Sequence, residues 1–365
     1  MIDTSSSEIK MRFFLGAIIF SREQSFLYLY CRRTINNKMS TNINKNKNYI
    51  KYRTNNTSFD LYDKVRGVIF GQAIGDALGL GTEFMSYNEV LKYYPQKLTS
   101  YNQILQDRHR IRWKAGEWTD DTDMMLCIAN AMIEDKDICL NHVAQNFKQW
   151  FRGTPMGIGQ YTNNVLAISD YTKDPIRAAS LVWKLSGEKS AANGGLMRTS
   201  VIGLWKKDVS LYAENICKLT HADPRCVGSC VILSELVHSF VWHDKELDFE
   251  TIIKIGNKYD ERIAPYLIAA MEAEQIQDLN LDDESAMGYT LKTLSAAVWC
   301  LYHVESFLEG LLAVVNAGGD ADTNAAVACS LLGAKYGYKS IPPYYIENLL
   351  GKNLLMNVSK KIYEL

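Results

Sequence analysis

The chain has 365 residues, of which 47% are hydrophobic and 22% charged, an ordinary composition for a globular protein with a large apolar core. Its 40 Lys and Arg residues are balanced by 41 Asp and Glu residues, so the net charge is −1. A protein that binds a nucleic-acid backbone usually carries a basic excess, and this balance therefore argues against nucleic acid as the partner.

The first 58 residues differ in composition from the rest of the chain. Residues 39–58 are rich in Asn, Lys and Thr and cannot bury enough apolar surface to fold alone, so residues 1–58 are predicted to form a poorly ordered tail. The apolar run Phe13–Phe20 is shorter than the ~20 residues of a membrane span. Its length would suit a signal peptide, but no cleavage pattern follows it, and Met39 offers an alternative start.

Residues 59–365 show helical periodicity throughout, because apolar side chains recur every three or four positions. In chain order, the intervals with this pattern are 61–78, 122–133, 141–151, 176–185, 226–240, 262–273, 290–302 and 306–315. Alternating, strand-like runs are almost absent. The pattern predicts one compact all-α domain without a dividing linker.

The first of these helices carries glycine at every fourth position. The four glycines, which share one helix face, are Gly67, Gly71, Gly75 and Gly79. A face without side chains lets another helix approach closely. Two acids lie at the end of this segment, Asp76 within the helical pattern and Glu83 seven residues later.

A cluster of polar residues opens the next helical interval. It reads Thr119, Asp120, Asp121, Thr122, Asp123 and stands directly before an apolar run. Asp and Thr are good helix openers, and capping is therefore the simplest explanation for such a cluster. Capping needs only one such residue, so five in succession suggest a second role.

The eight cysteines are scattered, and no pair has the C-x-x-C spacing of a zinc site. Cys226 and Cys230 lie near His221, which suggests a metal site as an alternative, but small apolar positions one helical turn apart are the simpler interpretation. Free thiols indicate an intracellular, cytoplasmic protein.

A second Asp/Thr cluster stands near the end of the chain. Asp320, Asp322 and Thr323 follow the pair Gly318-Gly319, which permits a tight turn, and precede the small-residue run 325–328. If the two helix N-termini face each other, four carboxylates and two hydroxyls meet in one small volume. These six groups belong to Thr119, Asp120, Asp121, Asp320, Asp322 and Thr323.

Carboxylates gathered in this way require a cation, because like charges a few ångströms apart would otherwise protonate or repel one another. The ligand set contains only oxygen, which indicates a hard ion, Mg²⁺ or Mn²⁺ in its place. Four acids are enough for two divalent ions that share a bridging carboxylate.

The motifs T-D-D-T and G-G-D-x-D-T, in this order, resemble the ADP-ribosylglycohydrolase family, which includes the dinitrogenase-reductase-activating glycohydrolases. The resemblance covers roughly residues 61–340. It implies an orthogonal helical domain over 59–365 with two Mg²⁺ ions (Mn²⁺ as the alternative) between helix N-termini. It also implies hydrolysis of the glycosidic bond between ADP-ribose and a protein side chain or small acceptor.

The resemblance assigns roles to further residues. Glu83 is implied as the catalytic acid/base, and Asp76 as a support for the metal ligands. Segments that resemble the family's substrate-binding loops contain Gly157, Ile158, Gly159, Gln160, Asn193, Gly194, Gly195 and His221. For Arg198, pairing with a phosphate and a buried structural ion pair both remain open.

Two alternatives to this function remain open. The first is a catalytically weak ADP-ribose-binding or crystallin-like structural protein on the same scaffold. The second is an unrelated two-metal phosphohydrolase, although such sites usually mix His with Asp. We expect a monomer whose partner is an ADP-ribosylated protein or an ADP-ribose-containing small molecule, with no nucleic acid and no membrane involved.

Overall fold

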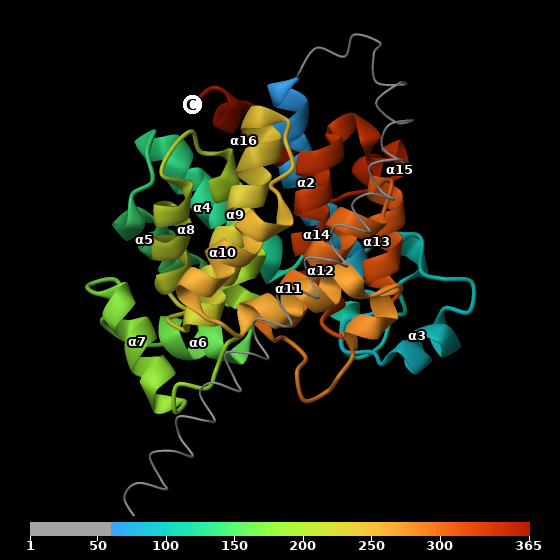
Figure 1. Ribbon diagram of the computed structural model, residues 1–365, viewed down its shortest axis with the longest axis horizontal. Coiled ribbons are helices and arrows are strands. Elements are labelled where there is room, and N and C mark those ends of the chain that lie inside the picture. Colours follow the sequence, from blue (N-terminus) through green and yellow to red (C-terminus); the bar gives the residue numbers. More distant parts are fainter. Residues whose placement is uncertain (1–59) are drawn as a thin grey trace, which may run out of the picture. The chain divides into compact units, whose positions relative to one another are not determined.

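The computed structural model describes residues 60–365, and in that part every regular element is a helix (Figure 1). The predicted tail 1–58 lies outside the described residues. The α-helices are α2 (Leu61–Gly79), α3 (Tyr87–Tyr93), α4 (Asp120–Asp135), α5 (Leu140–Arg152), α6 (Gln160–Leu166), α7 (Pro175–Leu185), α8 (Val209–Lys218), α9 (Pro224–His243), α10 (Phe249–Tyr259), α11 (Ile263–Glu272), α12 (Thr290–His303), α13 (Phe307–Val315), α14 (Ala321–Tyr336), α15 (Pro343–Glu347) and α16 (Lys352–Tyr363). Six short 3₁₀ helices connect some of them.

The all-α prediction is confirmed. Each of the eight intervals with helical periodicity coincides with a helix to within about three residues at either end, and α14 begins at the second Asp/Thr cluster. Extended pairing in the described part is limited to two isolated bridges, Met85 with Gly319 and Ala192 with Tyr289. Six helices were not predicted from the sequence: α8 and α10, the short helices α3, α6 and α15, and the C-terminal α16.

Helices α2 and α14 form the centre of the domain and lie antiparallel along each other (Figure 1). A Cβ atom added at Gly67, Gly71 or Gly75 would lie 2.2 Å from a backbone carbonyl oxygen of α14. These oxygens belong to Gly333, Cys329 and Ala325, in the reverse order along the chain. The glycine face of α2 therefore permits the backbone-to-backbone approach that the sequence predicted, and it brings the end of α2 to the start of α14.

The remaining helices surround this pair. α14 also packs against α12 and α13, and α9 packs against α8 and α10 on another side. Among the described helices, α9 alone is long and apolar enough to cross a membrane, but 78% of the relevant window is buried inside the domain. α9 is therefore a core helix of this fold.

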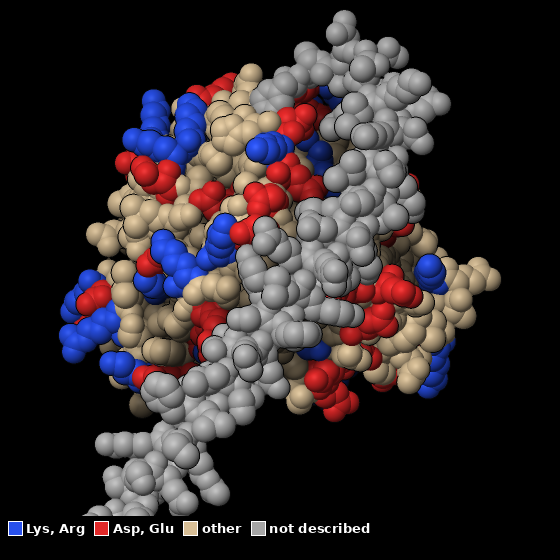
Figure 2. All heavy atoms as spheres, viewed as in Figure 1, with Lys and Arg blue, Asp and Glu red and all other residues tan. Residues whose placement is uncertain are grey.

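The seven cysteines in the described part are all free. On the face shown in Figure 2, basic and acidic side chains are interspersed over the described surface.

Candidate metal centre and active site

The two Asp/Thr clusters lie where the N-termini of α4 and α14 meet. Thr119 is the N-cap residue of α4 and Asp320 that of α14, yet neither side chain accepts a hydrogen bond from its own helix. The Thr119 hydroxyl donates to Asp121 Oδ2 at the start of α4, and the Thr323 hydroxyl of α14 donates to the same oxygen across the gap, both at 3.3 Å. Helix capping therefore does not explain why these residues stand at the two N-termini.

Asp76, on the last turn of α2, holds the start of α4 in place. Its Oδ1 accepts a hydrogen bond from the Thr119 backbone N–H (2.9 Å), and its Oδ2 accepts from the Thr122 N–H (3.0 Å) and hydroxyl (2.6 Å). Because Asp76 is fully buried and comes from the central helix, it fixes α4 relative to the rest of the core.

Before α14, the chain turns at two glycines with positive φ. Gly318 has a φ of +78° and Gly319 a φ of +73°. A Cβ at Gly319 would lie 2.1 Å from the Leu281 carbonyl oxygen, so no side chain fits there. This turn directs the carboxylates at the start of α14 toward α2 and α4.

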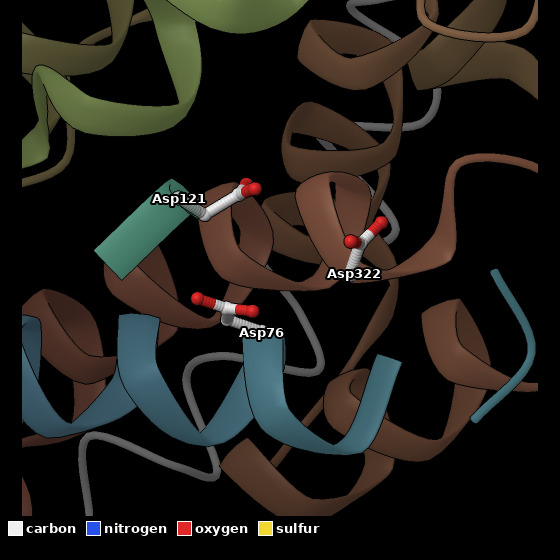
Figure 3. A group of neighbouring side chains, drawn as sticks. All are labelled: Asp76, Asp121 and Asp322. Carbon is white, nitrogen blue, oxygen red and sulfur yellow. The ribbon is translucent and has the colours of Figure 1, made fainter. Parts of the chain in front are cut away.

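The result is a cluster of carboxylates from three helices (Figure 3). One oxygen each of Asp76, Asp121 and Asp322 lie within 4.8 Å of one another. Glu83 forms a second such group with Asp320 and Asp322. Asp322 belongs to both groups, which gives the cluster two adjoining positions suited to a cation.

Burial and mutual repulsion disfavour the charged forms of these acids. Burial is the main cause that raises the pKa of Asp76 and of Asp120 to about 7 and the pKa of Asp320 to about 6. The pKa values of Asp121 and Asp322 are raised well above the usual range, first by burial and then by neighbouring carboxylates.

Two oxygen atoms of the cluster give the clearest indication that it suits a cation. Asp121 Oδ1 and Asp322 Oδ1 are buried, and neither has a hydrogen-bond partner among the described residues. A buried carboxylate oxygen without a partner is costly, because it has lost its hydration without compensation. A divalent cation with oxygen ligands fits this arrangement.

Glu83 follows α2 and points into the same region, where it is 9% exposed. Its Oε2 is 2.6 Å from Nε2 of His109, whose ring contacts those of Phe84 and Trp113, with centroids 5.5 and 5.4 Å away. The Arg112 guanidinium contacts the other ring nitrogen, Nδ1, at 2.6 Å. Since arginine can only donate, Nδ1 accepts and the proton on Nε2 points to Glu83.

Buried Arg110 also holds this segment. Its guanidinium donates to the backbone carbonyls of Glu83, Leu80 and Gly81. Neither His109 nor Arg110 was predicted from the sequence, because they lie at the start of the short 3₁₀ helix η2 (Arg110–Arg112), outside any motif.

Asn193 links the acidic cluster to 3₁₀ helix η3 (Asn193–Arg198). Its Nδ2 donates to Asp320 Oδ2 at 2.6 Å and to the Thr293 hydroxyl at 2.9 Å. The Thr293 hydroxyl in turn donates to Asn324 Oδ1 at 2.7 Å. Thr293 and Asn324, neither of which the sequence analysis singled out, thus fix Asn193 beside the cluster.

The glycine-rich loop before α6 approaches the cluster at Gly157. A Cβ at Gly157 would lie 2.7 Å from Asp120 Oδ1. Ile158 is half-buried, whereas Gly159 and Gln160 are exposed, and the Gln160 amide donates to Asn164 Oδ1 at 2.7 Å. Beside Gly157 lies a cavity of about 270 Å³, lined among others by Trp113, Trp118 and Asp120.

The remaining predicted substrate-binding residues, Gly194 and Gly195 of η3 and His221, pack against one another. Cβ atoms added at Gly194 and Gly195 would lie 3.1 Å and 3.3 Å from the ring and Cβ of His221. Arg198 is fully buried beneath them. Among the described residues it forms no ion pair, so the alternative of a buried structural ion pair for Arg198 is wrong. The guanidinium instead donates to two backbone carbonyls and to the Thr220 hydroxyl.

Comparison with known proteins identifies the family of the chain. The family model for ADP-ribosylglycohydrolase matches residues 57–365. The ADP-ribosylarginine hydrolase Tri1 of Serratia proteamaculans is 25% identical over 82% of this chain and 79% of its own length. An uncharacterized protein of Archaeoglobus fulgidus is 30% identical over 83% of this chain and 97% of its own.

Two further relatives extend the agreement. The ADP-ribosyl-[dinitrogen reductase] glycohydrolase of Rhodospirillum rubrum is 25% identical over 80% of this chain and 92% of its own length. A solved structure described as an ADP-ribosylglycohydrolase-related protein complex superposes with a TM-score of 0.65 at 25% identity, covering 83% of this chain and 98% of that one. The match of the family model over the whole described part shows that the chain belongs to the ADP-ribosylglycohydrolase family and is a glycosidase-type hydrolase.

Proposed function

We propose that the protein is a metal-dependent hydrolase that cleaves the glycosidic bond between ADP-ribose and a protein side chain or small acceptor. The observation that carries the proposal is the pair of buried, unpartnered oxygens, Asp121 Oδ1 and Asp322 Oδ1, within a cluster of carboxylates. Such a cluster is unfavourable without a cation, whereas a cation would compensate its charge. Family membership supplies the reaction class.

The metal ligands we propose are those of the two helix N-termini. They are Thr119, Asp120, Asp121, Asp320, Asp322 and Thr323. Their oxygen-only chemistry suits two Mg²⁺ ions, or Mn²⁺ in their place. The ions would orient the sugar and polarise a water molecule. Asp76 would hold the Thr119 backbone, as its hydrogen bonds to α4 indicate.

Glu83 is the residue we propose for proton transfer. The bond that breaks joins the anomeric carbon of the ribose to the acceptor atom, through a transition state with oxocarbenium character. Water supplies the new oxygen on the anomeric carbon, and its proton goes to the departing acceptor. The Glu83 carboxyl group can carry this proton, since it lies beside Asp320 and Asp322, and His109 fixes its orientation.

The substrate-binding residues we propose lie on the two sides of the cluster. Gly157 brings the loop with Ile158, Gly159 and Gln160 against Asp120, where backbone N–H groups can contact anionic oxygens. On the other side, Asn193 leads to Gly194, Gly195 and His221.

One assay distinguishes the proposed hydrolase from the alternative, a crystallin-like protein without turnover. The purified full-length chain is incubated with arginine-linked, serine-linked and acid-linked ADP-ribosyl peptides, with Mg²⁺, with Mn²⁺ or with excess chelator. Release of ADP-ribose from at least one peptide, only with metal present, supports the proposal. Binding of ADP-ribose without release from any substrate would support the structural alternative.

We also propose a cellular compartment and an oligomeric state for the enzyme. The seven free cysteines of the described part fit an intracellular compartment, where thiols stay reduced. We propose that the protein acts there as a monomer on an ADP-ribosylated protein or small molecule. Sedimentation of the purified chain, giving a mass near 41.4 kDa or a multiple of it, tests the oligomeric state.

A further inference from the structure

Phe84, the residue directly after Glu83, combines a strained backbone with an exposed ring. Its φ is +61°, the left-handed conformation that a bulky side chain rarely adopts, and it is 58% exposed. The other non-glycine residues with positive φ between residues 60 and 365 are all polar or charged. The strained backbone costs stability and the exposed ring contributes little to it, which indicates a role for Phe84 other than stability.

Hydrogen bonds on both sides hold the backbone of Phe84 in this conformation. Its N–H donates to the Gly319 carbonyl at 2.7 Å, and the Gly319 N–H donates to the Met85 carbonyl at 2.8 Å. On the other side, the Arg110 guanidinium donates to the Glu83 carbonyl. These contacts tie Phe84 to the turn that leads into α14, so the ring has a fixed place beside the acidic cluster.

The Phe84 ring and the Glu83 carboxylate share one neighbour, the imidazole of His109. The ring centroids of Phe84 and His109 are 5.5 Å apart, and His109 Nε2 lies 2.6 Å from Glu83 Oε2. Because Glu83 is the group proposed to carry the proton to the departing acceptor, the acceptor lies beside Glu83 when the bond breaks. The Phe84 ring is therefore within reach of the acceptor.

Two more exposed apolar residues, Ile111 and Met156, stand next to the residues that contact His109. Arg112, whose guanidinium contacts His109 Nδ1 at 2.6 Å, directly follows Ile111 in the chain and donates to the Met156 carbonyl at 3.1 Å. Single exposed apolar residues are common in globular proteins. Several of them beside a reactive group are typical of a surface that contacts another molecule.

We propose that Phe84 is a specificity-determining residue that contacts an apolar side chain next to the ADP-ribosylated residue of an acceptor protein. Ile111 and Met156 extend the same contact surface. Binding of the acceptor then buries the ring and provides the apolar contacts that it lacks in the free protein. This inference rests on the proposed function, and it favours a protein acceptor over a small one.

The test compares two peptides that carry the same ADP-ribosylated residue, flanked on both sides by Leu in one peptide and by Ser in the other. The linkage is the one that wild type hydrolyses best among the arginine, serine and acid linkages. In the full-length chain, Phe84→Asn suits the left-handed backbone but removes the ring, whereas Phe84→Tyr keeps the ring. Lys136→Asn is the matched control, because Lys136 also has a positive φ (+53°) and lies at the C-terminal end of α4, away from the acidic cluster.

We expect wild type, Phe84→Tyr and Lys136→Asn to have a kcat/KM about fivefold higher for the Leu peptide than for the Ser peptide, which corresponds to ~1 kcal/mol of apolar contact. In Phe84→Asn this preference should disappear, because KM for the Leu peptide rises at unchanged kcat. The melting temperature of Phe84→Asn should equal or exceed that of wild type, since asparagine relieves the strain. Its affinity for ADP-ribose, measured by calorimetry, should stay the same.

Equal kcat/KM values of wild type for the two peptides would overturn the inference, and so would a preference that persists in Phe84→Asn. A loss of kcat in Phe84→Asn that is the same for both peptides would show instead that the ring only supports Glu83. A clearly lower melting temperature of this variant would show that the ring serves the fold, which also overturns the inference. If wild type hydrolyses none of the three linkages, the proposed function itself fails, and this inference fails with it.

Discussion

At the scale of single residues, Glu83→Gln tests whether Glu83 transfers the proton. Glutamine keeps the shape of the side chain but cannot exchange a proton, so turnover should fall by ~10²–10⁴. ADP-ribose affinity, measured by calorimetry, should remain close to wild type, because losing transition-state stabilisation need not weaken ground-state binding. Glu89→Gln in nearby α3 is the matched control and should keep full turnover, since glutamine also suits its capping box with Ser86.

Near wild-type turnover in Glu83→Gln would remove this residue from the mechanism. Loss of both turnover and binding would instead make Glu83 a metal ligand or a residue that shapes the cleft.

Only some residues of the site could be predicted from the sequence. The Asp/Thr clusters at 119–123 and 320–323 were recognisable because they exceed what helix capping requires. His109 was not, since a single histidine between the predicted helices carries no periodic or motif signal, although it contacts Glu83 at 2.6 Å. Arg198 was ambiguous because two of its partners are backbone carbonyls, which every residue has.

At the scale of elements, the contact between α2 and α14 could be anticipated from glycines spaced four apart and from the small residues of the last motif. The direction and register in which α2 packs against α14 could not be predicted, because two small-residue helix faces can pack together in either direction and in several registers. Short helices such as α3 and α6, with seven residues each, were missed because they are too brief to show a helical period.

Gly71→Ala tests the close approach of the two helices. Its Cβ would lie 2.2 Å from the Cys329 carbonyl oxygen, and neither backbone can yield easily. The cost of this overpacking, about 1–3 kcal/mol or more, should exceed the gain in helix propensity of about 1 kcal/mol. We therefore expect a lower free energy of unfolding, measured with denaturant.

Gly310→Ala in α13 is the control for this variant. The nearest atom to its Cβ is the end of the Leu332 side chain, which can move, so the loss of stability should be smaller. A Gly71→Ala protein as stable as Gly310→Ala would mean that the two helices are farther apart than described.

At the scale of the whole molecule, the domain 59–365 and the tail 1–58 remain a prediction from composition. A shortened chain that begins near Asn55 should keep the melting temperature and the hydrolytic rate of the full chain, because the predicted tail is expected to contribute little to stability. An insoluble or inactive shortened chain would show that the tail belongs to the folded protein.

The acidic cluster should also make the stability of the metal-free protein depend on pH. The pKa values of Asp76 and Asp120, about 7, and of Asp320, about 6, lie above the value near 3.9 of an unfolded Asp. Between about pH 4 and 7 the folded state therefore binds more protons than the unfolded state, and stability falls as pH rises.

Thermal melts between pH 5 and 8, with chelator and with excess Mg²⁺, measure this effect. The lowered pKa of His221 acts in the opposite direction, so the informative quantity is the difference between the two series. The stabilisation by Mg²⁺ should grow as pH rises. A stabilisation that shrinks with rising pH would contradict the cluster as the metal site.

The central claim is that the facing N-termini of α4 and α14 hold the metals on which hydrolysis depends. Its most direct test is Mn²⁺ or Mg²⁺ titration by calorimetry of wild type and Asp322→Asn, combined with hydrolysis of ADP-ribosyl peptides. Wild type should bind two ions and lose all turnover in excess chelator, with recovery on adding metal. Asp322→Asn should lose metal affinity and turnover together. Full turnover of wild type in excess chelator, or undiminished metal binding by Asp322→Asn, would contradict the claim.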